Sequence, residues 1–372
     1  MLELLWSLDV YRGKKMRDTK ETLKYILKRI LLMLLTFSII FVVCFILIRL
    51  LPLESSAGPG QDPETFYQMQ VALGRMDRVA FTGNTSEDYE MKPVLEQLWN
   101  FLGNLFFPAS YETADGTIAY VSRWGYCWSA NVGPKLSTPD ELLFGKMPPT
   151  ILINLYSMLL SVPLGLALGT FMALKKNKWQ DHVLSVVVML LISVPSFVYS
   201  FFVKFILGYE LGWFPYEVAS LDSVGSWFAP GMIMSMVLPV LSMSFGSIAG
   251  YARYTRAELT EVLTSDFMLL ARTKGLTRSQ ATVRHAFRNS LVPIFPMLLG
   301  EILALLSGSM IIEEIFAVNG VGSLFINSIT SKDYDVFQFV GLFYILIGLV
   351  GGLVVDISYG LVDPRIRMGG KK

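Results

Sequence analysis

The chain has 372 residues, of which 53% are hydrophobic and only 16% are charged. A soluble globular domain carries about 25% charged residues, so this composition excludes an ordinary soluble protein and indicates a membrane protein. The 31 basic and 30 acidic residues leave a net charge of +1, which gives no reason to expect a nucleic-acid partner. Two cysteines and two histidines supply neither a disulfide framework nor a metal-ligand cluster, and no G-x-x-x-x-G-K-[ST] phosphate-binding loop occurs. We therefore expect no bound cofactor and no catalytic residues in this chain.

A basic amino-terminal segment precedes the first hydrophobic run. Residues 1–29 hold eight Lys and Arg residues and lack the cleavage pattern of a signal peptide. The apolar residues at 2–8 allow either a short interfacial helix or a frayed terminus. Residues 30–51 are almost entirely apolar and long enough for one transmembrane helix, which needs about 20 residues. Arg49, near the end of this run, is expected to extend toward the interface.

The interval 52–147 is long and polar, with 12 acidic and 6 basic residues, and it starts as a Pro-, Gly- and Ser-rich loop. Residues 93–107 have the period of an amphipathic helix, whose apolar side would consist of Val94, Leu95, Leu98, Phe101, Leu102, Leu105 and Phe106. The Trp and Tyr residues of this interval indicate a compact element near the lipid headgroups. Residues 60–92 and 109–140 have no clear period, so most of these stretches receive no predicted structure.

Five further apolar runs of about 20 residues follow. They lie near 150–173, 183–207, 232–250, 291–312 and 336–359, and three of them contain internal prolines that we expect to be simple kinks, Pro163, Pro195 and Pro239. With the amino terminus inside, the inner segments carry 22 Lys and Arg residues and the outer segments only 7. The positive-inside rule then predicts the orientation.

The fold class is therefore an all-α polytopic membrane protein with six transmembrane helices, both termini cytoplasmic, and a long extracytoplasmic segment after the first helix. The predicted parts are a cytoplasmic segment 1–29, a first span 30–51, an extracytoplasmic segment 52–147, a five-helix core 148–359 and a cytoplasmic tail 360–372.

The most informative stretch is the basic interval 251–290, which this topology places in the cytoplasm. Its apolar residues recur at helical spacing, at Leu259, Val262, Leu263, Phe267, Leu270 and Ala271. Gly275 can adopt a positive φ at a helix C-terminus, and Thr277 can cap a second helix over 277–289. The stretch predicts a helix, a glycine turn and a second helix, shaped to dock on a partner. A basic loop that only sets the topology is the alternative.

This stretch resembles the coupling loop of binding-protein-dependent ABC importers, in the form found in the oligopeptide and dipeptide permease family. Ala271 and Gly275 match the family's Glu-Ala-Ala…Gly motif, while its glutamate is absent, as is common in the oligopeptide branch. Further blocks that resemble the family follow one another along the chain, at 144–150, 194–197, 211–215, 308–334 and 355–367. Asn319 replaces a family proline, and the segment 52–147 is longer than in the simplest members.

The resemblance implies a permease subunit of an ATP-driven importer and not an enzyme. Its implied partners are a second homologous permease subunit, two ATP-binding cassette subunits that hold ATP and Mg²⁺, and an extracytoplasmic solute-binding protein, assembled in the lipid bilayer of a bacterial-type plasma membrane. The expected solute is an oligopeptide or dipeptide, and nickel or another small solute is the alternative within the family. A self-contained channel or secondary transporter is disfavoured because no internal repeat relates 30–207 to 208–359. An intramembrane enzyme is disfavoured because the spans hold no catalytic constellation.

The resemblance also suggests which residues are functional. The loop would lie in a groove of the ATPase, with candidate coupling residues Asp266, Ala271, Arg272, Lys274, Gly275, Arg284 and His285. Glu301 is a lone carboxylate midway along the fifth span, where an unpaired charge is costly, so we expect it to line or border the translocation path and to meet the amino group of a peptide. A protonated carboxyl, or an ion pair with Lys204, is the alternative. Lys204 lies near the end of its own span and is expected to snorkel.

Overall fold

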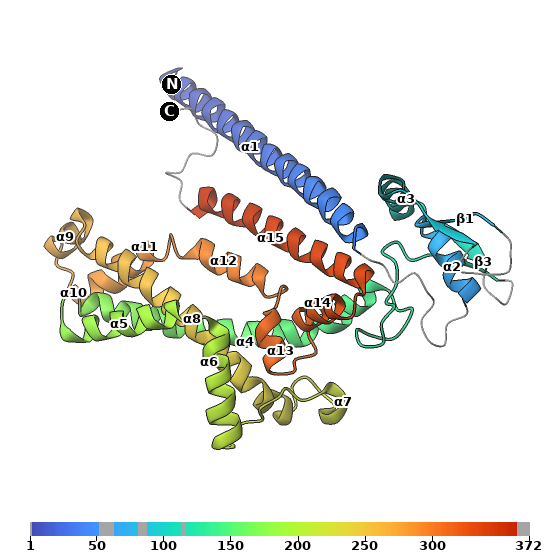
Figure 1. Cartoon of the computed structure of the whole chain (residues 1–372). Coiled ribbons are helices and arrows are strands. Elements are labelled where there is room, and N and C mark those ends of the chain that lie inside the picture. The colour runs from blue at the N-terminus through green and yellow to red at the C-terminus, as the bar shows by residue number, and fades with distance from the viewer. Residues whose placement is uncertain (1, 52–62, 81–87, 113–116, 363–372) are drawn as a thin grey trace. The chain divides into compact units, whose positions relative to one another are not determined.

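The computed structural model describes residues 2–51, 63–80, 88–112 and 117–362 (Figure 1). The predicted loop at 52–60 and residues 363–372 of the predicted tail lie outside these ranges. The chain divides into two compact units. Unit 1 consists of Met1–Leu35, Pro149–Val318 and Ile347–Lys372, and unit 2 consists of Thr36–Pro148 and Asn319–Leu346.

The described chain is mostly helical and carries several candidate membrane spans, as predicted. Four of its helices are long and apolar enough to cross a membrane: Leu23–Arg49, Pro139–Leu174, Pro230–Leu263 and Tyr334–Ser358. The number reaches six if each of two bent helix pairs forms one span. The six-helix count and the orientation therefore stay predictions.

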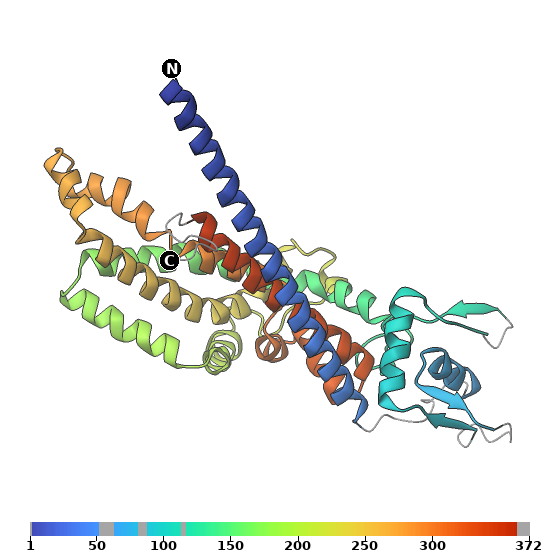
Figure 2. The same cartoon turned by 90° about the horizontal axis from the view of Figure 1, so that it is seen from above.

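The first helix, α1 (Leu2–Arg49), runs for 48 residues without interruption (Figure 2). The predicted boundary between the basic segment 1–29 and the first span is thus no break in the backbone. The helix contains no proline and ends three residues before Pro52, because a proline disfavours helical backbone in the residue before it.

The predicted span 183–207 is broken, so the expectation of a simple kink at Pro195 is wrong. α5 (Trp179–Ser193) ends there, and α6 (Ser196–Val203) continues into the π-helix η1 (Lys204–Glu210) at an angle of 98° to α5 (Figure 1). Pro195 cannot donate to the α5 ladder and drives Val194 into extended backbone, with φ −86° and ψ 125°. Pro163 and Pro239, in contrast, lie inside uninterrupted helices.

The predicted span 291–312 is also not one helix. α11 (Arg288–Ser290) ends before a turn that contains Pro293, α12 (Phe295–Ala304) follows at 54° to the helix that ends at Ser290, and α13 (Met310–Ile315) is separate. Gly308, with φ +64°, lies in the break between α12 and α13. A side chain at this position would collide with Glu313 and Thr150, so the break needs glycine.

The remaining helices of the core fall into two groups by length. The long ones are α4 (Pro139–Leu174), α8 (Pro230–Leu263) and α15 (Tyr334–Val362). α4 begins inside the interval that we assigned to the polar segment 52–147. The short ones are α7 (Leu221–Val224), α9 (Asp266–Thr273), α10 (Arg278–Ala281), the π-helix η2 (Thr282–Phe287) and α14 (Val321–Thr330).

The segment after α1 adds a small amount of strand to a chain that is otherwise helical, as the predicted fold class requires. It contains α2 (Pro63–Ala72), the predicted amphipathic helix as α3 (Val94–Phe106), and two antiparallel strand pairs. β1 (Met76–Arg78) pairs with β2 (Tyr89–Met91), with Asp77 opposite Glu90. β3 (Ser110–Glu112) pairs with β4 (Ile118–Tyr120), with Tyr111 opposite Ala119. Both pairs lie in stretches for which the sequence predicted nothing, because three-residue strands are too short to show a period.

Unit 2 is assembled around the buried carboxylate of Asp335, in the first turn of α15. Its Oδ1 accepts from Arg75 Nη2 at 2.6 Å, and its Oδ2 accepts from Trp128 Nε1 at 2.9 Å and from the Tyr126 N–H at 3.2 Å. Arg49 Nη2 lies 3.6 Å from Oδ1, and the Arg49 guanidinium also lies over the Phe45 ring. The expectation that Arg49 extends to the interface is therefore wrong, because its charge has partners inside the protein.

Asp333, two residues earlier, supports the same region. Its Oδ2 accepts the backbone N–H groups of Trp128 at 2.7 Å and Ser129 at 2.9 Å. Burial raises the pKa of Asp333 to about 6, and these two donors oppose the rise only in part.

Asp333 should give unit 2 a defined pH dependence. An ordinary Asp has a pKa of about 4, so between about pH 4 and 6 the folded state holds a proton that the unfolded state has released. This stabilisation is complete below about pH 4 and is lost as the pH rises through 6, which amounts to at most about 3 kcal/mol. Asp333→Asn should flatten the dependence, measured as the temperature of half-unfolding of the purified protein over this range. Equal pH slopes for the variant and the parent protein would contradict the assignment.

Candidate functional site

The basic interval 251–290 folds as a helix, a glycine turn and a helix, as predicted. Gly275 has φ +90°; its N–H donates to Arg272 O at 3.0 Å, and the Leu276 N–H donates to Ala271 O at 3.3 Å. These two bonds are those of a Schellman motif, which closes α9. Thr277 then caps the next helix, because its Oγ1 accepts the Gln280 N–H at 3.3 Å and the Gln280 side chain accepts the Thr277 N–H at 3.1 Å.

The interval has a small core of its own, built mostly from short side chains. Its buried members are Ala173, Leu259, Met268, Ala271, Ala281 and Ala286. Ala271 therefore faces this core, where its small side chain lets the helices approach closely. Of the predicted apolar positions on α9, Ala271 is buried but Phe267 and Leu270 are exposed, and Met268, which was not among them, is buried. The stretch between Leu263 and Asp266 is also a break between α8 and α9.

The outer face of the interval combines apolar and basic side chains. Six of the seven predicted coupling residues are exposed: Asp266, Arg272, Lys274, Gly275, Arg284 and His285. Leu269, Leu270 and Val283 are exposed with them, and the sequence reasoning did not identify these as contact residues. The Leu269-Leu270 doublet was the available signal, because a helix can bury only part of such a run. Exposed apolar side chains that lie among basic side chains are typical of a surface that a protein partner covers. We refer to Leu269, Leu270, Val283 and these basic neighbours as the docking face.

A bidentate ion pair fixes the helix that leads into this interval. Arg256 on α8 donates from Nε to Asp181 Oδ1 at 2.5 Å and from Nη2 to Oδ2 at 2.8 Å. Asp181, on α5, is fully buried and also accepts the Asn177 N–H at 3.1 Å. Two parallel charge-assisted bonds set both the distance and the angle between α5 and α8. Nothing in the sequence identified Asp181, and Arg256 counted there only as a positive charge.

Two glycines bring α4 close to the same helix. A Cβ at Gly169 would lie 2.5 Å from Ala252 O, and a Cβ at Gly165 would lie 2.5 Å from Tyr251 Cβ. Glycine at positions i and i+4 is the pattern that lets two membrane helices approach backbone to backbone. α8 therefore contacts both α4 and α5 through its residues 251–256, at the start of the basic interval.

α4 also carries a buried polar stripe. Thr150, Asn154 and Ser157 recur at helical spacing and lie on one side of the helix. Thr150 Oγ1 donates to Glu313 Oε1 at 2.9 Å, Asn154 Nδ2 donates to Leu305 O at 3.0 Å, and the Ser157 hydroxyl lies 3.1 Å from that of Ser244. Thr150 and Asn154 thus supply hydrogen-bond partners to groups on either side of the break between α12 and α13. Irregular backbone at membrane depth is tolerated only where protein or a wet cavity supplies such partners.

Glu301, the predicted path residue, is half-buried and accepts a hydrogen bond from the Tyr251 hydroxyl. The pairing with Lys204 that the sequence left open is not formed. Lys204 Nζ instead donates to Ile315 O at 2.5 Å and lies 5.9 Å from the centres of the Tyr216 and Phe316 rings. Lys204 therefore turns toward the end of α13, and the expectation that it snorkels is not met in this arrangement.

Comparison with known proteins identifies a family for this chain. Residues 165–368 match the family model described as a binding-protein-dependent transport system inner membrane component. That match covers more than half of the chain, including the basic interval, the break near Gly308 and α15.

Similar proteins align over nearly the whole chain. A dipeptide transport system permease protein of Lactococcus lactis subsp. cremoris is 30% identical over 346 residues, which cover 93% of this chain and 100% of that relative. An oligopeptide transport system permease protein of Haemophilus influenzae is 30% identical, covering 93% of this chain and 99% of the relative. A glutathione transport system permease protein of Shigella flexneri is 28% identical, with the same coverage.

The ion pair between Asp181 and Arg256 should behave as one unit. Asp181 is buried while Arg256 is part-exposed, so Arg256→Gln, which leaves the buried carboxylate unpaired, should destabilise the folded chain by about 1–3 kcal/mol, and Asp181→Asn should cost less. The double variant should lose little more than the worse single variant. The measurement is the temperature at which half of the detergent-solubilised protein loses its monodisperse peak. Losses that simply add would show that the two side chains are not coupled.

Proposed function

The chain belongs to the family of binding-protein-dependent transport system inner membrane components, and on this premise we propose that it is the permease subunit of an ATP-driven importer of peptides. The substrate class is supported by the relatives, which are named for dipeptide, oligopeptide and glutathione transport and align over nearly their full lengths. An extracytoplasmic binding protein would deliver the peptide. ATP and Mg²⁺ would bind to partner ATPase subunits, so this chain itself performs no catalysis.

The proposed topology has six spans in a bacterial-type plasma membrane. In this arrangement each bent helix pair counts as one span, both termini lie in the cytoplasm, and the segment 52–147 lies outside. The distribution of 22 Lys and Arg residues on one side against 7 on the other supports it.

The observation that carries the proposal is the docking face. Its exposed leucines and basic side chains would enter a groove of an ATPase subunit, and the capped helix that starts after Thr277 would transmit the movement of that subunit. Asp266 and the exposed basic residues would form polar contacts there, while Gly275 would hold the turn. Since α8 leads into this region and is fixed to α5 by the Arg256–Asp181 pair, a displacement of the docking face would move both helices.

The translocation path is proposed to run beside Glu301. A half-buried carboxylate on a membrane helix is suited to meet the amino group of a peptide, and the Tyr251 hydroxyl would hold it in place until then. The break between α12 and α13, with its supporting side chains on α4, supplies polar groups within the same unit.

The first experiment is a tagged purification of the chain from its native membrane in mild detergent, with the co-purifying chains identified and counted. One second permease and two ATPase subunits would establish the proposed complex. A particle of this chain alone that transports solute without ATP would refute it and favour a channel or secondary transporter. Vesicle uptake of labelled peptides, compared with uptake of nickel ions by the same complex, separates the two solute classes.

The docking face provides a sharper test. Leu269→Asp places a charge in the proposed contact, and we expect about tenfold less ATPase subunit to co-purify, because an apolar anchor at such an interface contributes about 1–2 kcal/mol. Leu269→Met, which stays apolar, is the matched control and should retain the ATPase. The second permease should remain bound in both variants. Full ATPase recovery with Leu269→Asp would remove the docking role from this face.

The path residue is tested by uptake kinetics. Glu301→Gln should slow the uptake of peptides with a free amino group about fivefold, because the amide no longer carries the charge that meets it. Peptides with a blocked amino group should be unaffected. Tyr251→Phe removes only the supporting hydroxyl and should change uptake about twofold at most. If Glu301→Gln leaves every tested peptide unchanged, the path role is wrong.

A further inference from the structure

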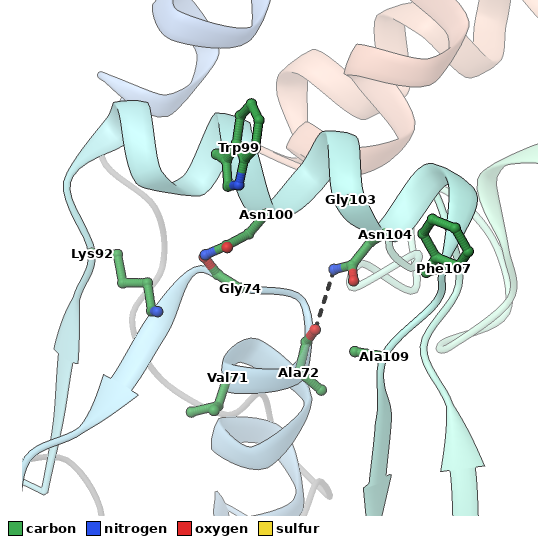
Figure 3. A pocket seen from close by; sticks show the side chains of 10 residues that line it. All are labelled: Val71, Ala72, Gly74, Lys92, Trp99, Asn100, Gly103, Asn104, Phe107 and Ala109. Carbon is green, nitrogen blue, oxygen red and sulfur yellow. Dashed lines mark hydrogen bonds between the residues drawn. The ribbon is translucent and has the colours of Figure 1, made fainter.

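Helix α3 buries amide side chains along one side and exposes large apolar side chains along another. Gln97 and Asn104 are only 2% and 9% exposed. Gln97 Nε2 donates to Lys92 O at 2.8 Å, Asn104 Nδ2 donates to Ala72 O at 3.2 Å, and Asn100 Nδ2 donates to Gly74 O at 3.1 Å (Figure 3). Every one of these amides thus has a partner within the protein.

The outward residues of α3 are large and apolar. Leu95, Trp99 and Phe106 are 71%, 76% and 74% exposed, and they recur at helical spacing along one side. Figure 3 shows Trp99 directed away from Ala72, toward which the Asn104 side chain points. A helix in water has the opposite arrangement, because exposed apolar area costs about 25 cal/mol per Å². The surroundings of this side of α3 are therefore apolar.

The remaining side of α3 packs on the apolar part of α1. The Phe101 ring lies 5.9 Å from that of Phe41 and 5.3 Å from that of Phe45, all within unit 2. Phe45 and Phe41 precede Arg49 by four and eight residues respectively, which is about 6–12 Å along a helix. Helices that lie in a membrane interface sit about 5–10 Å into the boundary between headgroups and acyl chains. α3 therefore packs beside the last turns of the apolar part of α1, which is where a span ends if α1 crosses the bilayer.

The charges near α3 do not suggest a protein partner. Lys92 Nζ lies 3.1 Å from Asp77 and 2.8 Å from Glu96, so the cation at the start of the helix already has its counter-charges within the protein. The three exposed residues Leu95, Trp99 and Phe106 are uncharged. Charge complementarity therefore offers nothing to a partner protein, whereas an uncharged apolar stripe with a Trp suits lipid.

We propose that α3 is an interfacial helix, embedded in the leaflet that surrounds the C-terminal end of α1, with lipid acyl chains against Leu95, Trp99 and Phe106. The segment after the first span is then anchored in the membrane and does not lie free in the aqueous phase. This inference requires only that α1 crosses the bilayer, and it is independent of the transported solute.

A photo-crosslinking experiment tests it. The photoreactive amino acid p-benzoylphenylalanine replaces Trp99 or Phe106 in the full chain, and the intact complex is reconstituted in phosphatidylethanolamine and phosphatidylglycerol vesicles whose acyl chains carry an alkyne. Irradiation should give lipid adducts at both positions, about tenfold above those at the control position Glu90, which is exposed on β2.

Each result has a definite meaning. Adducts with the second permease or with the binding protein in place of lipid would overturn the proposal, as would lipid adducts no stronger than at Glu90. Labelled complexes are used only if they elute as the parent complex does. Should a replacement prevent assembly, Trp99→Phe and Trp99→Asp provide the second measurement: the first should retain normal yield in the membrane and the second should not. Equal yields would again contradict a lipid contact.

Discussion

Unit 2 depends on the interactions of one buried carboxylate, that of Asp335. It is almost completely buried, and it is offset by Arg75 at 2.6 Å and by Arg49 at 3.6 Å. Desolvation of charges is expensive unless they are paired and hydrogen-bonded, and the Trp128 indole and the Tyr126 backbone supply further bonds to the Asp335 carboxylate. Arg49 ends α1, Arg75 directly precedes β1, and Tyr126 and Trp128 lie in the loop before α4. One side chain therefore specifies how the segments of unit 2 meet, and the loss of any partner would leave the others unsatisfied.

Local patterns were predictable because their partners are near in the sequence. The positive φ at Gly275, the cap at Thr277 and the helix α3 each depend on residues within a few positions, so periodicity and residue type were enough. At Pro195 the sequence predicted only a simple kink, and the angle of 98° was not predictable because it depends on what packs against each arm.

Long-range partners were not predictable from one sequence. Asp181 and Arg256 are 75 positions apart in the sequence, Thr150 and Glu313 are 163 apart, and Arg75 and Asp335 are 260 apart. The local sequence around each of these residues did not identify its partner. The same limit explains Glu301 and Lys204, which were considered as a pair and have different partners. On α9, the small Ala271 was assigned to a partner contact because small size serves close packing inside a protein as well as between proteins.

The contact between α4 and α8 has a mechanical consequence. Gly165 and Gly169 let the two backbones come into contact. Around them, Leu168 and Met172 of α4 pack against Ala249 and Ala252 of α8, and the Ser157 and Ser244 hydroxyls lie 3.1 Å apart. The bidentate bond from Arg256 to Asp181 joins α8 to α5 as well. α4, α5 and α8 should therefore move together as one lever, because neither separation nor sliding is possible without breaking these contacts.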